Sequence, residues 1–83
     1  MPWKLEKKPR FKKDISKIPQ GEQNRIDAGI RGLINNPSQA DIVKLNDQLW
    51  RLRVGDWRVF LDMDNKTGTI TALYLERRTS KTY

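Results

Sequence analysis

The hydrophobic pattern of this chain changes at Ile42, and that change constrains the fold more than any other feature. Before it, apolar residues recur at the spacing of helices, and after it they alternate with polar residues as strands do. Gly55-Asp56 and residues 65–68 interrupt the second half and are typical of tight hairpin turns. The second half therefore predicts a meander of strands at 42–45, 49–54, 57–63 and 69–76.

The residues before Ile42 predict one strand and two helices. Residues 3–6 alternate apolar and polar side chains, which is typical of a short strand. Pro9 suits a first helical turn, and apolar residues recur at helical spacing from there to Pro19. A second apolar series, at 26–34, indicates another helix. Because the connection between the two helices is short, we expect an antiparallel helical hairpin.

The order of these elements predicts the fold class. A strand, a helical hairpin and then antiparallel strands form a single α+β domain over residues 1–83, with the helices on one face of the sheet. The length of 83 residues suits one such domain. Gly29 and Gly32 lie inside the second helix, where each costs about 1 kcal/mol relative to alanine. We interpret both as places where another element packs closely.

Two residue types that carry much enzyme chemistry are absent. The chain has no cysteine and no histidine, which excludes disulfides, the usual zinc sites and nucleophile pairs of the Ser-His or Cys-His type. An enzyme built from this sequence would use lysine, arginine, tyrosine and carboxylates. We expect neither a metal nor a cofactor.

The net charge of +7 indicates a polyanionic partner. Nucleic acid, an acidic protein or an anionic membrane surface would each fit. The membrane is the least favoured of these, because no apolar run approaches the roughly 18 residues that a span needs, and the first residues lack the apolar segment of a signal peptide. We expect a cytoplasmic protein.

Basic residues also gather on the predicted first helix. Lys12, Lys13 and Lys17 form its polar face. They are either a solvated helix face or a surface that contacts phosphates, and charge alone does not separate the two interpretations.

Counting residue pairs outward from the predicted hairpin turns places arginines from separate strands close together. A two-residue turn at Gly55-Asp56 places Arg53 opposite Arg58, so that these two residues and Arg51 share one face of the sheet.

The next turn extends this cluster. A four-residue turn at 65–68 pairs Asp64 with Thr69 and places Arg58 opposite Leu75, which predicts Arg77 on the arginine face. The helices should cover the other face, where nearly all the side chains are apolar. That set is Trp57, Val59, Leu61, Met63, Ile70, Ala72 and Tyr74.

Four arginines on one sheet face repel one another, so we expect an anion or an acidic partner to cover them. The alternative is an ordinary solvated basic face, with Asp56 and Asp62 as counter-charges. On a nucleic-acid-binding surface, Phe60 and Tyr83 are exposed aromatic residues that would stack on bases.

The segments LWRLRVGDWRVFLDMD and LYLERRTSKTY, behind a strand and a helical hairpin whose first helix carries KKDISKIP, resemble the RelE/ParE superfamily of bacterial toxins from toxin-antitoxin operons. The resemblance covers essentially the whole chain and implies a βααβββ-type, RelE-like fold. Its most specific part is the combination of an RLR-x-G-x-aromatic-R-V hairpin with an arginine six residues before a tyrosine.

In the RelE branch, the resemblance implies a cytoplasmic endoribonuclease that cleaves mRNA in the A site of the small ribosomal subunit without a metal. By position, Arg58, Arg77 and Tyr83 match its active residues. Arg51 and Leu49 stand where RelE has lysines. The resemblance also implies a small antitoxin that wraps around the toxin and neutralises it.

The RNA would be cut by its own 2′-hydroxyl, which needs a base, a stabilised pentacoordinate phosphate and a proton for the leaving oxygen. We expect Arg51, Arg58 and Arg77 to clamp the phosphate, because arginine holds two phosphate oxygens at once. Arginine is a poor base. Tyr83, with the pKa of its phenol lowered by nearby arginines, or Lys81 would take the proton, and the sequence leaves that choice open. The predicted further RNA contacts are Arg53, Lys81, Phe60, Lys12 and Lys13.

Two other functions compete with this hypothesis. The ParE branch resembles RelE in fold, lacks its nuclease residues and acts on DNA gyrase through protein contacts. A non-catalytic nucleic-acid-binding module would use the same basic face only to position phosphates. Retention of Arg58, Arg77 and Tyr83 favours the nuclease over the gyrase inhibitor.

Overall fold

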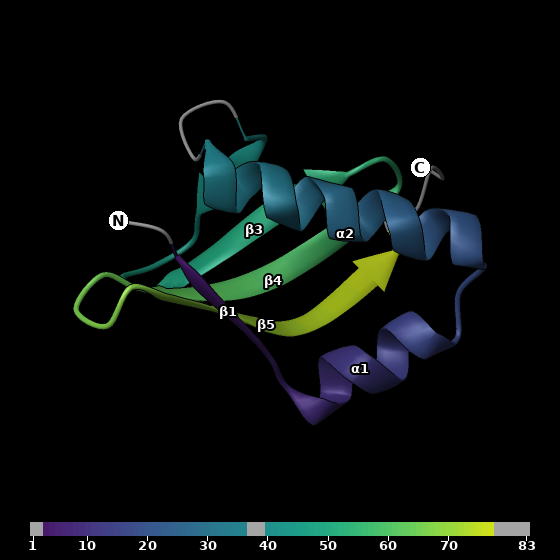
Figure 1. Ribbon diagram of the computed structural model, residues 1–83, viewed down its shortest axis with the longest axis horizontal. Coiled ribbons are helices and arrows are strands. Elements are labelled where there is room, and N and C mark those ends of the chain that lie inside the picture. Colours follow the sequence, from purple (N-terminus) through teal and green to yellow (C-terminus); the bar gives the residue numbers. More distant parts are fainter. Residues whose placement is uncertain (1–2, 37–39, 78–83) are drawn as a thin grey trace, which may run out of the picture.

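Figure 1 presents a computed structural model of the chain, and the structure describes residues 3–36 and 40–77. Seven elements follow one another along this part of the chain. They are β1 (Lys4–Lys7), α1 (Pro9–Ser16), α2 (Gln20–Asn35), β2 (Ile42–Lys44), β3 (Leu49–Val54), β4 (Trp57–Asp64) and β5 (Thr69–Arg77). The predicted element order and α+β class are confirmed.

The strands form one sheet in the order β1-β5-β4-β3-β2. Strands β2 to β5 are an antiparallel meander, as the alternating pattern predicted. The first strand joins at the other edge, where it runs parallel to β5 and pairs Lys4 with Thr69 and Lys7 with Ala72. Because β1 ends there, the rest of β5 has no strand beside it on that edge.

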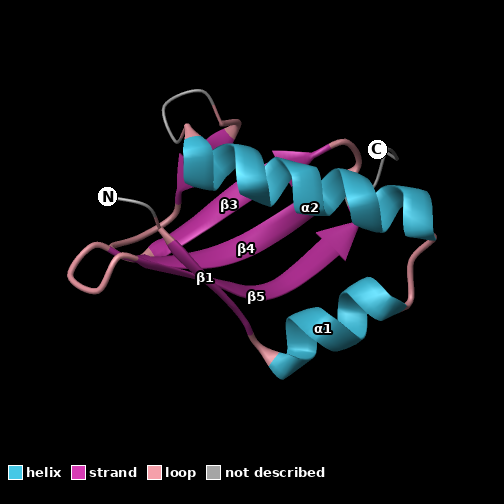
Figure 2. Cartoon of the chain, in the orientation of Figure 1, coloured by secondary structure: helices cyan, strands magenta, loops and turns pink. Residues whose placement is uncertain are grey.

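Both helices lie on one side of the sheet, with the chain reversing at residues 17–19 between them (Figures 1 and 2). They cover different strands: α1 packs along β5 and α2 packs over β3. The core lies between the helices and the sheet. Its buried members are Phe11, Ile26, Ile30 and Leu33 from the helices, and Leu52, Val59, Leu61, Ile70, Ala72 and Leu75 from the strands.

The two glycines of α2 differ in what surrounds them. A Cβ placed on Gly29 would lie 2.7 Å from Cγ2 of Val54, so glycine lets β3 approach the helix as predicted. A Cβ placed on Gly32 would meet nothing within 4 Å. The expectation of close packing is therefore confirmed at Gly29 and wrong at Gly32.

The β3–β4 hairpin has the predicted register. Val54 pairs with Trp57, Arg53 with Arg58, and Arg51 with Phe60. Gly55 in the turn has a φ of 57°, a left-handed conformation that glycine adopts without steric cost.

The β4–β5 register departs from the prediction. Asp64 pairs with Thr69 as expected, but Phe60 pairs with Tyr74 and Leu61 with Ala72, so Leu73 is an extra residue that forms a β-bulge. Arg58 consequently lies opposite Glu76 and not opposite Leu75.

The bulge reverses which side of the sheet the last residues of β5 face. Leu75 pairs with Val59 and is buried in the core, although the sequence placed it on the arginine face. Tyr74, predicted to lie under the helices, instead pairs with Phe60 on the opposite side. Arg77 pairs with Trp57, which is a core-side residue.

Candidate nucleic-acid interface

The sheet face turned away from the helices carries the candidate site, and we call it the outer face. Val59 and Leu61 are fully buried under the helices, so their neighbours along β4 point to the other side. The outer face is defined by Arg51, Arg53, Arg58, Phe60 and Tyr74.

Three arginines gather in one hollow on this face. A cavity of about 120 Å³ is lined by Arg51, Arg53 and Arg58 together with Asp41 and Val43. Val43 pairs with Arg51 from the edge strand β2. The predicted clustering of these arginines is confirmed, because the two-residue turn at Gly55-Asp56 sets the register of both strands.

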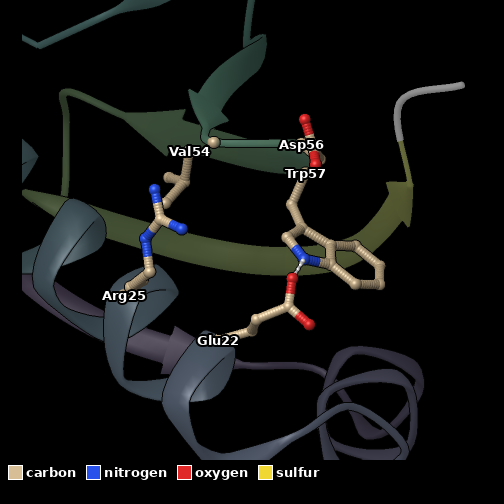
Figure 3. Close-up of a pocket in the computed structure, with 6 residues that line it drawn as sticks. Glu22, Arg25, Val54, Asp56 and Trp57 are labelled. Carbon is tan, nitrogen blue, oxygen red and sulfur yellow. Dashed lines mark hydrogen bonds between the residues drawn. The ribbon is translucent and has the colours of Figure 1, made fainter. Parts of the chain in front are cut away.

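One arginine of the hollow already has a counter-charge. The Arg53 Nε lies 3.0 Å from the Asp41 Oδ2, and the Arg53 backbone N–H donates to the Asp41 carbonyl oxygen at 2.9 Å. Asp56, one of the expected counter-charges, instead lies in the β3–β4 turn next to Trp57, where it lines a pocket together with Glu22 and Arg25 of α2 (Figure 3). Asp62 faces Leu49 and Thr71, away from the arginine pairs.

The other two arginines form no ion pair in the described part of the chain, although Glu76 lies opposite Arg58 in the β4–β5 ladder. Within residues 3–36 and 40–77, neither Arg51 nor Arg58 has a carboxylate oxygen within 4.0 Å of its side-chain nitrogens. Both are half-buried, so part of each side chain is shielded from water. Two partly desolvated like charges in a hollow favour the binding of an anion, because a phosphate gains attraction from both at once.

Arg77 does not join this cluster, contrary to the prediction. Its Cζ lies 5.9 Å from the centre of the Trp57 ring, and the Trp57 Nε1–H donates to Glu22 of α2 at 2.9 Å. Figure 3 shows the indole of Trp57 and Glu22 meeting between the sheet and the helix. Arg77 is therefore exposed on the helix side of the sheet, at the end of β5.

The aromatic residues of the outer face also differ from the expectation. Phe60 is buried, with 9% of its surface exposed, because Tyr74 stacks on it at 4.6 Å between ring centroids and 16° between planes. The Cζ of Arg10 lies 4.3 Å from the centre of the Tyr74 ring. Tyr74 and Arg10 thus belong to the site, although the sequence had pointed to neither.

The remaining predicted contacts divide into two groups. Lys12 and Lys13 are exposed on α1. Lys81 and Tyr83 lie outside the described residues. In the described part of the chain, no group of three side chains of the metal-binding types comes together, and no helix is long and apolar enough to cross a bilayer.

Solved structures similar to this one were found. The chain matches the archaeal RelE of a RelE-RelB complex from Pyrococcus horikoshii OT3 with a TM-score of 0.84 and 24% identity, covering 98% of this chain and 100% of that one. The chain has the RelE fold. The RelBE2 toxin-antitoxin complex of Mycobacterium tuberculosis matches with a TM-score of 0.80 and 18% identity, over 94% of this chain and 100% of that one.

The likeness extends to a RelE solved without its antitoxin. The isolated RelE toxin of E. coli matches with a TM-score of 0.79 at only 8% identity, over 95% of this chain and 87% of that one. No protein-family model matches the sequence, and no curated protein matches it. At these identities the RelE fold is shared while most side chains differ, so the site must be judged from this chain's own residues.

On this RelE fold, the sequence alone missed Tyr74 and Arg10 for different reasons. Tyr74 was placed on the wrong face because residues 72–75 are all apolar or aromatic. No alternation of polar and apolar residues in this segment therefore indicates where the bulge lies. Arg10 stands in the first turn of α1, and only the packing of α1 along β5 brings it to the outer face.

Proposed function

We propose that this protein is the toxin of a type II toxin-antitoxin system and that it cleaves mRNA in the ribosomal A site. The observation that carries the proposal is the hollow on the outer face of the RelE fold, where Arg51 and Arg58 lie without a carboxylate partner among the described residues. Cleavage would take place in the cytoplasm and would need neither a metal nor a cofactor.

Arg51 and Arg58 would hold the scissile phosphate. Attack of the 2′-hydroxyl on the adjacent phosphorus forms one P–O bond, and the bond from phosphorus to the 5′-oxygen then breaks. In the pentacoordinate state between these two steps, negative charge is concentrated on the phosphate oxygens. A guanidinium supplies two parallel N–H donors and a charge that does not titrate, which suits this stabilising role. Arg53, which Asp41 holds at 3.0 Å, would support the position of the RNA without adding its full charge.

Proton transfer needs other groups, because arginine does not give up its proton. Tyr83 or Lys81 would accept the proton of the 2′-hydroxyl, and the group that accepted it, or water, would give a proton to the leaving 5′-oxygen. Arg77 would contact the RNA where it passes the end of β5, since its side chain is exposed there. With so few groups for acid-base chemistry, we expect slow cleavage of free RNA and much faster cleavage on the ribosome, which would align the reacting atoms.

A cognate antitoxin would cover the same surface. RelE has been solved in complex with RelB in several of the matching structures. For this chain, we expect an antitoxin segment with carboxylates where it meets Arg51 and Arg58, because the net charge of +7 attracts an acidic partner. The rate of association should then fall as salt is added.

Primer extension on a defined mRNA, with and without programmed ribosomes, tests the nuclease function. We expect cleavage that requires ribosomes, is strongly slowed in Arg58→Ala and is less strongly reduced in Arg77→Ala. The matched control is Arg31→Ala, which removes an exposed arginine from α2 and should leave the rate of cleavage unchanged. Absence of ribosome-dependent cleavage by the wild-type protein would overturn the proposal, and a DNA supercoiling assay with gyrase would then test the ParE-like alternative.

A further inference from the structure

Four side chains form a row across the outer face, at right angles to the strands. Arg51 on β3 pairs with Phe60 on β4, and Phe60 pairs with Tyr74 on β5. Arg10 of α1 follows at the far side of Tyr74. The row thus places two aromatic rings between two arginines, one of which belongs to the hollow described above.

Tyr74 is the ring in this row that a ligand can reach. Phe60 stacks on one face of Tyr74 at 4.6 Å, so the guanidinium of Arg10, 4.3 Å from the ring centre, lies over the other face. Phe60 itself is buried, whereas Tyr74 is half-buried. The Arg10 side chain therefore covers the face of Tyr74 that Phe60 leaves free.

Arg10 is weakly held and can move from this position. Its side chain is 67% exposed, and its nearest carboxylate, Asp14, lies 3.9 Å from the Arg10 Nε. The attraction between a solvent-exposed cation and an aromatic ring is weak, so it holds the Arg10 side chain only loosely. A base that stacks on Tyr74 would replace this contact and leave the guanidinium free to bind a phosphate.

The position of Asp14 shows which flank of α1 faces the site. Asp14 accepts a hydrogen bond at 3.5 Å from the Leu75 N–H, on the edge of β5 that β1 leaves open. Arg10 lies one turn before Asp14 on this flank, and Lys13, three residues after Arg10, adjoins Arg10 on the side away from Asp14. Lys12, two residues after Arg10, points away from that flank.

We propose that Tyr74, Arg10 and Lys13 form a binding site for one nucleotide of single-stranded RNA, next to the arginine hollow. The base stacks on the face of Tyr74 that Arg10 now covers, Arg10 turns to the adjoining phosphate, and Lys13 binds the next phosphate. This inference rests on the proposed function for its RNA substrate. An acidic protein segment fits less well, because its carboxylates gain nothing from an aromatic face.

RNA binding by the purified full chain tests the inference. The probe is a short fluorescein-labelled single-stranded oligonucleotide with 2′-O-methyl riboses, which cannot be cleaved, and a second probe keeps the same phosphates but lacks the bases. Fluorescence anisotropy gives Kd for each combination of protein variant and probe. The titrations are done at about 0.1 M salt, where distant charges are screened.

Loss of the aromatic face should weaken binding only where bases are present. For Tyr74→Leu we expect Kd for the complete RNA to rise at least about 5-fold and Kd for the abasic probe to stay unchanged. Tyr74→Phe keeps the ring and should bind like the wild type. Thermal unfolding followed by circular dichroism shows whether Tyr74→Leu is folded, and Tyr74→Phe together with Arg10→Ala tests the site if it is not.

The charged residues should separate by their place on the protein. Arg10→Ala and Lys13→Ala should each weaken binding of both probes and reduce the slope of log Kd against log salt by about 0.7. Arg31→Ala removes one charge from an exposed position on α2 and should leave affinity and slope close to those of the wild type.

Three results would overturn the inference. Equal losses in Arg31→Ala and Lys13→Ala would indicate a general charge effect, and equal binding of both probes by the wild type would show that the surface binds phosphates without stacking a base. Unchanged RNA affinity in Tyr74→Leu and Arg10→Ala would place the RNA elsewhere. Ribosome-dependent cleavage is measured separately. Because cleavage can persist in each of these cases, failure of this inference is distinguishable from failure of the proposed function.

Discussion

Phe60 and Tyr74 stack face to face on the outer face, with ring centroids 4.6 Å apart, because Leu73 is an extra residue in β5. The bulge shifts the strand by one residue relative to an unbroken ladder. Without that shift, Tyr74 would lie under the helices and Leu75 would point to the outer face. The composition of the candidate RNA surface therefore depends on one irregularity in the sheet.

The bulge predicts unequal effects of truncating two leucines. Leu75→Ala should lower the free energy of unfolding by about 2–4 kcal/mol, because it leaves a cavity in the core, whereas Leu73→Ala, at a half-buried position, should cost about 1 kcal/mol or less. Urea unfolding followed by circular dichroism measures both values. A larger loss at Leu73 than at Leu75 would contradict the observed register.

The two glycines of α2 should respond oppositely to alanine. Gly29→Ala should destabilise the protein by about 1 kcal/mol or more, because the new methyl group would lie 2.7 Å from Val54 Cγ2. Gly32→Ala should stabilise it by about 0.5–1 kcal/mol, since the site is open and alanine favours the helix. Thermal unfolding of the two variants gives the comparison, and a shift of the same sign in both would count against it.

Asp41 should limit the affinity of the hollow for RNA. Asp41→Asn removes the counter-charge 3.0 Å from Arg53, so we expect Kd for single-stranded RNA to fall about 2- to 5-fold at low salt. Asp27→Asn changes the same charge on α2, where the carboxylate lies 3.9 Å from Lys7, and serves as the matched control. Anisotropy titrations check both, and equal tightening would indicate net charge alone.

Arg53 and Arg58 should contribute unequally to cleavage although they lie side by side. Arg58 has no described carboxylate partner and should stabilise the developing phosphate charge directly, so Arg58→Ala should slow ribosome-dependent cleavage about 100-fold. Arg53→Ala should slow it less than about 10-fold, because Asp41 already offsets that charge. Single-turnover rates on programmed ribosomes measure the difference, and the reverse ranking would reassign the phosphate contact.

Much of this architecture was predictable from the sequence, because the physics involved is local. The change of hydrophobic period at Ile42 separated helices from strands, and the Gly55-Asp56 turn set the β3–β4 register and with it the cluster of Arg51, Arg53 and Arg58. A two-residue hairpin turn leaves little freedom of register, so counting outward from it placed these side chains correctly.

Only the tertiary structure decided how β5 meets its neighbours. Ala72, Leu73, Tyr74 and Leu75 suit either register, since each register places an apolar or aromatic residue toward the core. The observed one places Leu75 in the core and its backbone N–H beside Asp14 of α1, a contact between residues 61 positions apart that no local pattern encodes. Packing between α1 and the open edge of β5 therefore brought Tyr74 and Arg10 together, and the bulge in β5 placed Arg77 beside Trp57, apart from the other arginines.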